Sequence, residues 1–589
     1  MNLLRKIAEA GKLRRALFVC DRDELRQQAI TAFQGVFGAD AAVVVAGNPQ
    51  KNARVLIATY QTLDVASDEA SANFLTDNYP PDYFSHIIID ECHRSAWGKW
   101  SIVLSRNGKA AQIGLTATPR RIEGVAVETK QGQADLKIAA DNYTHFGEPV
   151  YEYDMSQGIE DGYLAACEIH QFDLFHDNKD VSEREAGVAK EDLLGKRLTD
   201  ARTGAVVSAD EAADWYSASA LEDRLISPER VAAMAKDLFQ HLIDSGGPEQ
   251  KTIIFCARDR HADDVATVMN NLYVEWCNAQ GRQRMDPYAF KCTAESEGGD
   301  FLADFRGSQR RFFVATTVEL LTTGVDVPAV ENIVFFKYVL SPIAFYQMVG
   351  RGTRIHNPTG KLMFRVYDYT DATRLFGEEF KGKVAPPRKP GPKGPDGPEP
   401  PQTIQVEGIE VVVTQAGHSI LTQVDGHAMP VPIEEYRQRL AARLLEEAPS
   451  LDAFRKLWVV PPERLKMLGN LPDAGRSPLI VQQVTGKKDF DLFDVLGDLA
   501  YGLLPLSRAD RADAFAYKHE AWLASLPKEA AAALRALVSQ FAKGGTESLE
   551  NPEVLDTPEV RLAGGLAALK FLGKPAEVLL DAKRRMFAA

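Results

Sequence analysis

The chain has 589 residues, of which 25% are charged and 45% are hydrophobic, and its formal net charge is −14. This length predicts several domains with sizeable cores, and the acidic balance argues against nucleic-acid binding by the surface as a whole, although an acidic protein can still carry a basic groove. Because no apolar stretch reaches membrane-span length and the six scattered cysteines form no CxxC pair, we expect a cytoplasmic protein without a signal peptide, disulfide framework or zinc site.

Residues 1–165 alternate short apolar runs with helical stretches, which is the pattern of a parallel α/β domain. A helix is expected at residues 23–37. Strands are expected at residues 16–20, 42–45, 55–58, 86–89 and 112–115.

The strand at residues 86–89 ends in two adjacent carboxylates, Asp90 and Glu91. Acids at the carboxyl end of a buried parallel strand lie where open α/β sheets bind ligands. We therefore expect Asp90 to hold Mg²⁺ and Glu91 to orient a water molecule against a phosphate. On its own, the same run also fits an ordinary strand with a solvated tip.

Two further strand ends of this block carry candidate side chains. Arg22 lies beside the start of a helix and is a candidate for contact with the nucleic-acid backbone. The simpler interpretation of this segment is a helix N-terminus capped by Asp21 or Asp23, and the two interpretations are compatible. Thr59 and Gln61 can donate hydrogen bonds to phosphate oxygens. A plain strand end explains these two residues equally well.

A second α/β block is expected at residues 229–380, after a connector at residues 166–228 that holds one strand (168–175) and a charged helical stretch. The block's helices are expected at residues 231–243 and 262–277. Its strands are expected at residues 252–255, 312–315, 332–336 and 362–367.

Near the end of this block, Gln347, Arg351 and Arg354 recur at helical spacing and are expected to share one helix face. Two guanidiniums on such a face can reach a γ-phosphate as arginine fingers. A solvated basic helix face is the alternative. It fits less well, because Gly350 and Gly352 cost helix stability without an evident structural return.

The last part of the chain begins with a linker at residues 381–403, whose prolines prevent it from burying a core. A short β segment is expected at residues 404–432 and a mostly helical domain at residues 433–589. In that domain, apolar residues fall on one helix face. They are Tyr436, Leu440, Leu444 and Leu445.

Several motifs stand in the order of those of superfamily 2 helicases: DECH at 90–93, GLTATP at 114–119, ATTVELLTTGVDVP at 315–328 and QMVGRGTR at 347–354. Over nearly its whole length, the chain resembles the R subunit of type I restriction-modification enzymes. VCDRDEL (19–25), DECHRS (90–95) and MVGRGTR (348–354) carry this resemblance, together with the C-terminal segments 449–458, 462–469 and 493–501.

The resemblance implies two RecA-like parallel-sheet domains of the P-loop NTPase fold, the first one truncated at its N-terminus, and a helical C-terminal assembly domain. It also implies an ATP-dependent translocase of double-stranded DNA, with ATP and Mg²⁺ as cofactors and with methylase and specificity subunits as partners. Coupling residues would be His93, Thr116 and Thr118. Nucleotide-side residues would be Asp90, Glu91, Gly324, Asp326, Gln347, Arg351 and Arg354. DNA-side residues would be Arg22, Thr59, Gln61, Arg258, Thr316 and Thr317.

Two features of the R subunit are not found in the sequence. No nuclease constellation is evident, since the ExK spacing at residues 128–130 lacks a partner aspartate, and no G-x-x-x-x-G-K-[ST] loop occurs. We therefore expect a motor fragment with impaired ATPase activity on its own. The alternatives are a non-catalytic module that docks on the methylase–specificity complex through residues 433–589, and another superfamily 2 DNA helicase.

Overall fold

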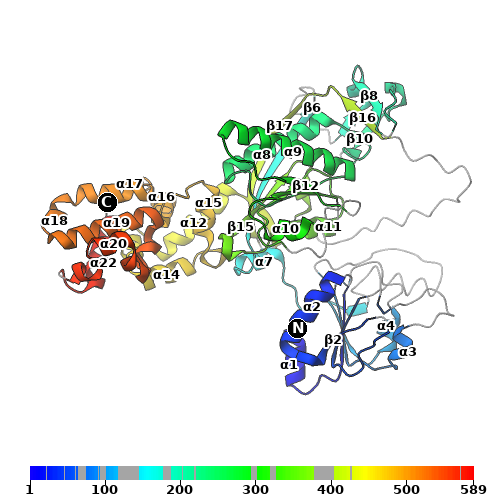
Figure 1. Cartoon of the computed structure of the whole chain (residues 1–589), viewed down its shortest axis with the longest axis horizontal. Coiled ribbons are helices and arrows are strands. Elements are labelled where there is room, and N and C mark those ends of the chain that lie inside the picture. The colour runs from blue at the N-terminus through cyan, green and yellow to red at the C-terminus, as the bar shows by residue number, and fades with distance from the viewer. Residues whose placement is uncertain are drawn as a thin grey trace, which may run out of the picture.

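A computed structural model describes residues 1–20, 23–45, 47–59, 62–63, 74–90, 92, 101–116, 145–176, 187–201, 203–217, 220–293, 301–318, 327–376, 403–424, 427–570 and 572–588. These residues form two parallel-sheet α/β domains, a small β unit and a mostly helical C-terminal region (Figure 1). The predicted fold class is thereby confirmed. In the described residues, no helix is long and apolar enough to cross a membrane.

The first domain is a five-stranded parallel sheet in the order β2-β3-β1-β4-β5. Alternate strand residues join two apolar clusters, one packed with α1 and α2 and the other with α3 and α4. Burial on both faces explains why these strands are continuous apolar runs. The strands are β1 (Ala16–Cys20), β2 (Ala41–Val43), β3 (Val55–Thr59), β4 (His86–Ile89) and β5 (Ala111–Gly114), and the helices are α1 (Asn2–Glu9), α2 (Asp23–Phe37), α3 (Phe74–Asn78) and α4 (Ser101–Arg106).

The second domain is built on an eight-stranded sheet in the order β12-β13-β11-β14-β15-β6-β17-β18. The first six strands run parallel, and β17 and β18 add an antiparallel edge. The strands are β6 (Ala166–His176), β11 (Thr252–Phe255), β12 (Ala289–Lys291), β13 (Val314–Thr317), β14 (Asn332–Phe335), β15 (Met363–Asp368), β17 (Val411–Val424) and β18 (His427–Pro432).

Helices cover both faces of this second sheet. Ile254 and Val334 pack in the same cluster as the buried faces of α8 and α9, while Ile253 and Ile333 pack in another with α10, α11 and the C-terminal helices. Ser227 caps α8 by accepting a hydrogen bond from the Arg230 backbone N–H, and Pro228 opens the helix. The bounds are α7 (Met155–Glu160), α8 (Pro228–Ser245), α9 (Asp259–Gln280), α10 (Leu302–Gly307) and α11 (Pro342–Val349).

Two parts of the chain predicted as separate units contribute to this sheet. The predicted connector, residues 166–228, supplies β6, and the predicted β segment, residues 404–432, supplies β17 and β18. The expected strand at 312–315 begins two residues later, as β13, because Phe312 is buried with φ at +56°.

The small β unit combines four short strands from residues 187–226, which precede α8, with β16, which follows β15 in the sequence (Figure 1). Its three-stranded sheet has the order β10-β16-β8, and β7 pairs with β9. Gly408, at φ +92°, separates β16 from β17, so one predicted β run serves two different sheets. The strands are β7 (Gly187–Ala189), β8 (Arg197–Asp200), β9 (Trp215–Ser217), β10 (Leu225–Ile226) and β16 (Ile404–Glu407).

The C-terminal region is helical from Ile433 onwards, as expected. Its helices are α12 (Ile433–Glu447), α13 (Leu451–Trp458), α14 (Pro461–Gly469), α15 (Ser477–Val484), α16 (Leu492–Tyr501), α17 (Arg508–Lys518), α18 (Glu520–Ala524), α19 (Lys528–Glu550), α20 (Pro558–Leu562), α21 (Gly565–Lys570) and α22 (Pro575–Phe587).

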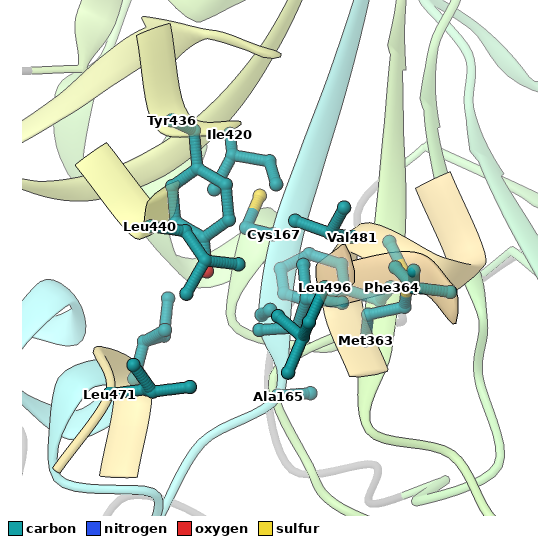
Figure 2. Packing of buried hydrophobic residues seen from close by; sticks show 14 of the residues in the cluster. Ala165, Cys167, Met363, Phe364, Ile420, Tyr436, Leu440, Leu471, Val481 and Leu496 are labelled. Carbon is teal, nitrogen blue, oxygen red and sulfur yellow. The ribbon is translucent and has the colours of Figure 1, made fainter. Parts of the chain in front are cut away.

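These helices share one apolar core with the second sheet. Figure 2 shows Tyr436 and Leu440 of α12 near Ile420 of β17 and Cys167 of β6, all buried. The Arg476 guanidinium donates hydrogen bonds to the carbonyls of Ile159 and Leu164, at 2.7 and 2.9 Å. The helical region is therefore packed against the second domain, although a proline-rich segment separates the two in sequence.

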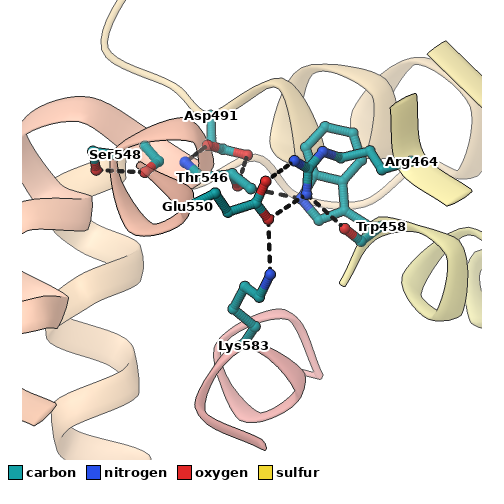
Figure 3. A network of polar contacts seen from close by, with 8 residues as sticks. Trp458, Arg464, Asp491, Thr546, Ser548, Glu550 and Lys583 are labelled. Atoms are coloured by element: carbon teal, nitrogen blue, oxygen red, sulfur yellow. Dashed lines mark hydrogen bonds and ion pairs between the residues drawn. The ribbon is translucent and has the colours of Figure 1, made fainter. Parts of the chain in front are cut away.

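A charged network inside the helical region ties α14, α19 and α22 together (Figure 3). Arg464 donates to the Glu550 carboxylate and, at 2.9 Å, to the Trp458 carbonyl, and Lys583 lies 2.7 Å from Glu550. Burial alone would raise the pKa of Glu550, but the hydrogen bonds from Arg464 and Lys583 outweigh it and lower the pKa. The ionised carboxylate thus holds two cations that are nearly buried.

Glu550→Gln is expected to lower the free energy of unfolding at pH 7 by about 1.5–3 kcal/mol, because two charge-assisted hydrogen-bonding partners lose their anion. A depressed carboxyl pKa stabilises the fold above its unfolded value, near 4.5, and this stability is lost as the pH falls through the folded value. Urea titrations between pH 7 and pH 3 should therefore show the difference between wild type and variant shrinking below about pH 4.5. The exposed Glu547→Gln is the matched control, and an equally large effect there would contradict the prediction.

Candidate functional site

Asp90 follows directly on β4 and is held between the two neighbouring strands. Its backbone N–H donates to the Val19 carbonyl of β1 at 2.9 Å, and the Leu115 N–H after β5 donates to Ile89 at 2.8 Å. The side chain of Asp90 is half-buried. Asp90 therefore lies at the carboxyl edge of the first parallel sheet, the edge at which such sheets bind ligands.

The strand register places other candidates at the same edge. Cys20 pairs with Thr59, and Val19 pairs with Ile89, so Thr59 and Asp90 end strands that flank β1. Two strand spacings separate them, about 10 Å. Thr116 lies two residues beyond β5 and is half-buried. The strand pattern predicted this edge for Asp90, and the register adds Thr59 and Thr116 to the same edge.

Thr59 has internal hydrogen-bonding partners. Its side chain is 2% exposed, and its hydroxyl lies 2.8 Å from that of Thr62 and accepts a hydrogen bond from the Thr62 N–H. These contacts favour the plain strand end over a direct DNA contact for Thr59. The predicted residues Arg22, Gln61, Glu91, His93, Thr118, Gly324 and Asp326 lie outside the described residues.

Cys92 packs against the end of β5 at Gly114. The Cys92 N–H donates to the Leu115 carbonyl at 3.0 Å, and a β-carbon on Gly114 would lie 2.8 Å from the Cys92 sulfur. Cys92 is thus a buried core residue. All six cysteines are free and buried, as expected for small core side chains.

The prediction that Gln347, Arg351 and Arg354 share a helix face is wrong. Helix α11 ends at Val349, so Gln347 is helical and the two arginines lie in the turns that follow. Those turns are closed by N–H groups of Arg351 and Gly352, which donate to carbonyls three residues earlier. Arg351 is half-buried and Arg354 is exposed.

This arginine turn, residues 350–354, is fixed by packing and by a buried lysine. A β-carbon on Gly352 would overlap the ring of Phe364 in β15, so only glycine lets the backbone of the turn approach this ring so closely. Gly352 therefore has a structural role that the sequence analysis did not identify. Lys361 is 6% exposed and donates to the carbonyls of Gly352 and Pro328, at 2.7 and 3.1 Å. It thereby links the arginine turn to the end of the predicted motif at residues 315–328.

Sequence reasoning did not identify Lys361. A signal was nevertheless present, because this lysine directly precedes a predicted buried strand, where a cation needs acceptors.

Gly352→Ala is expected to lower the free energy of unfolding by about 1–3 kcal/mol, because the added methyl group overpacks the contact with Phe364. Urea denaturation measures the change. Gly469→Ala is the control, since a β-carbon there meets nothing within 4 Å. Equal stability of the two variants would show that the close approach is not required.

Among the remaining candidates of the second domain, Thr316 and Arg258 have side-chain partners, whereas the buried Thr317 hydroxyl makes no hydrogen bond to the described residues. Thr316 and Thr317 are fully buried in β13, and the Thr316 hydroxyl donates to the Ala262 carbonyl of α9 at 2.8 Å. This burial contradicts the predicted direct DNA contact of both threonines. Arg258 precedes α9, has a side chain that is 54% exposed and forms an ion pair with Asp223.

Sequence models of three protein families match the chain in order. Residues 1–121 match the res subunit of type III restriction enzymes, residues 234–356 match the helicase conserved C-terminal domain, and residues 434–581 match the EcoEI R protein C-terminal family. The chain is 28% identical to the type I restriction enzyme EcoAI endonuclease subunit of Escherichia coli, over 94% of its own length and 69% of that subunit.

The chain belongs to the family of type I restriction enzyme R subunits. A second family member, the EcoKI endonuclease subunit of Escherichia coli K12, is 24% identical, with 62% of this chain and 31% of that subunit covered. Among solved structures, a fragment of an HsdR subunit of a type I restriction enzyme from Vibrio vulnificus is 28% identical, with a TM-score of 0.40, and the match covers 62% of this chain and 55% of the fragment. The chain thus spans about a third to two thirds of the length of these R subunits.

Proposed function

We propose that this R subunit chain is the motor part of a type I restriction-modification system, which hydrolyses ATP and moves along double-stranded DNA. The observation that carries the proposal is the Asp90 strand end, because it stands within the segment that matches a restriction-enzyme family and precedes a segment that matches a helicase family. In P-loop NTPases, an aspartate at such a strand end helps to hold the Mg²⁺ of the bound nucleotide.

Asp90 is suited to hold Mg²⁺, because its carboxylate is half-buried at the sheet edge and Mg²⁺ prefers oxygen ligands. Bound Mg²⁺ would neutralise charge on the phosphates of ATP. In this proposal Glu91 orients the attacking water, and Arg351 and Arg354 approach the γ-phosphate from the second domain. Gln347, Gly324 and Asp326 complete the nucleotide side, while His93, Thr116 and Thr118 couple the nucleotide to DNA.

The proposed partners are double-stranded DNA and the methylase and specificity subunits. The match of residues 434–581 to the EcoEI R protein C-terminal family supports a role of the helices in assembly. Because these helices share a core with the second domain, a partner bound to them is connected rigidly to one half of the motor.

ATP hydrolysis stimulated by double-stranded DNA tests the proposal. It should be measured for the chain alone and for a form extended at its N-terminus by a P-loop segment, each with and without the methylase–specificity complex. We expect the extended form to hydrolyse ATP and its Glu91→Gln variant to be slower on the order of a hundredfold or more. Equal rates would contradict the role of Glu91. Triplex displacement without strand displacement would distinguish translocation from unwinding.

A non-catalytic docking module is the second candidate. It is favoured by one observation, since no G-x-x-x-x-G-K-[ST] loop occurs in the 589 residues. If no form hydrolyses ATP while the chain still binds the methylase–specificity complex, this candidate replaces the motor.

A further inference from the structure

Glu168, His170 and His418 converge on the second sheet, outside every residue assigned to the motor. Glu168 and His170 lie on β6, and His418 lies on the neighbouring strand β17, directly opposite His170. On the other side of β6, Arg365 of β15 stands opposite Glu168. Three adjacent strands thus bring two imidazoles, one carboxylate and one guanidinium together.

A β-bulge in β17 aims His418 at this cluster. Gln415 pairs with Phe172 and His418 pairs with His170, so three steps along β17 match two steps along β6. Side chains of a regular strand alternate between faces, and residues three apart point to opposite faces. The extra residue at the bulge restores His418 to the face of His170. Bulges that redirect a side chain in this way are frequent beside functional sites.

The spacing of the three ligand atoms is close to that of a metal site. The Glu168 Oε1 atom lies 2.8 Å from His418 Nε2 and 3.2 Å from His170 Nε2. All three ligand atoms lie within 4.8 Å of one another. In a tetrahedral zinc site with ligands at their usual distances, neighbouring ligand atoms are about 3.3–3.6 Å apart, so small side-chain rotations suffice.

Arg365 fixes the orientation of the Glu168 carboxylate. Arg365 Nε lies 2.9 Å from Glu168 Oε2, which leaves Oε1 facing the two imidazoles. The oxygen that faces the imidazoles is therefore the one available to a cation.

His170 faces the Glu168 carboxylate but makes no well-aligned hydrogen bond within the described residues. A neutral imidazole offers one ring nitrogen with a free lone pair, which can bind a metal ion. Both ring nitrogens of His170 are buried without a hydrogen bond from the described residues, although Nε2 faces a carboxylate oxygen. A cation between Nε2 and Oε1 would bind both atoms, in place of the hydrogen bond that the Nε2–H tautomer can donate to the carboxylate.

We propose that Glu168, His170 and His418 bind one divalent transition metal ion of the zinc type. Two imidazole nitrogens and one carboxylate oxygen are ligands that Zn²⁺ accepts, while Mg²⁺ and Ca²⁺ prefer oxygen alone. His418 has a side chain that is 31% exposed, so the fourth position is open to water from that side. The metal would attach β17, which follows the proline-rich segment, to β6, and this role is independent of ATP hydrolysis.

Metal binding by the whole chain tests the site. After treatment with a chelator and its removal, the protein should be titrated with Zn²⁺ by calorimetry, and the bound metal counted by elemental analysis. We expect one equivalent to bind to the wild type and at least a tenfold weaker affinity for His418→Ala. His241→Ala is the matched control, because this neighbouring ring lies 5.8 Å from His170 and is not one of the three ligands. It should bind as the wild type does.

Two measurements, one spectroscopic and one thermal, distinguish loss of the metal site from loss of the fold. Co²⁺ bound to nitrogen and oxygen ligands should give weak visible bands without a thiolate charge-transfer band, in wild type and His241→Ala only. Zn²⁺ should raise the thermal midpoint of these two proteins and leave that of His418→Ala unchanged. Equal stoichiometry and affinity in wild type and His418→Ala, or no bound equivalent in the wild type, would overturn the proposal.

Discussion

Arg351→Ala is expected to slow DNA-stimulated ATP hydrolysis on the order of a thousandfold, because the proposed role of Arg351 is that of an arginine finger, and such residues contribute at least this factor to phosphoryl transfer. The backbone at Arg351 is held in a defined position. It follows the end of α11 in a turn that Lys361 and the Phe364 contact of Gly352 hold in place. A half-buried guanidinium on a rigid turn loses little freedom when it meets a phosphate. The rate should be measured on the most active form found in the ATPase assay.

Two companion variants make this result specific. Arg351→Lys keeps the charge but loses the planar fork, so we expect most of the loss to remain. Arg310→Ala removes an exposed arginine of the same domain and should leave the rate unchanged. A rate of Arg351→Ala within a few fold of Arg310→Ala would exclude Arg351 from the hydrolytic step.

Asp494→Ala is expected to lower the free energy of unfolding by about 3–5 kcal/mol, the largest stability effect we predict. Asp494 and Arg511 have side chains that are 0% and 1% exposed, and they pair through two hydrogen bonds, of 2.5 and 2.7 Å. The guanidinium also donates to the Met586 carbonyl and lies 5.0 Å from the ring centroid of Phe493. Removing the aspartate leaves a buried cation without its anion, and the cost should appear in urea denaturation.

A double variant and an exposed pair are the controls. Asp494→Leu combined with Arg511→Met removes both charges, so it should be less destabilising than Asp494→Ala. Glu435→Ala breaks an exposed helical ion pair with Arg439 and should cost less than about 1 kcal/mol. If Asp494→Ala cost no more than Glu435→Ala, the buried pair would have no special role in holding α16 and α17 together.

Much of the fold follows from local sequence patterns. Runs such as Leu17 to Val19 and Ile87 to Ile89 are apolar at every position, because alternate residues face helices on opposite sides of the sheet. The spacing of Tyr436, Leu440 and Leu444 likewise predicted α12, whose buried face consists of these residues and Ile433. Leu445, which was predicted on the same face, is instead exposed. The end of an apolar strand also located Asp90 at the sheet edge, since parallel strands carry their carboxyl ends on one side.

Long-range contacts determined the parts of the fold and of the candidate sites that local sequence patterns did not predict. Helical spacing placed Arg351 and Arg354 on a helix, but the contact of Gly352 with Phe364 and the bonds of Lys361 hold them in a turn. Pairing of β6 with β17 joins His418 to Glu168 across 250 positions. Local propensity contains no information on which distant strand completes a sheet, because that choice depends on packing and register. The sequence by itself therefore determined the two α/β blocks, the helical region and the Asp90 edge. Only the tertiary structure decided the eight-strand sheet, the arginine turn and the histidine cluster, since each of these depends on side chains that meet across distant segments.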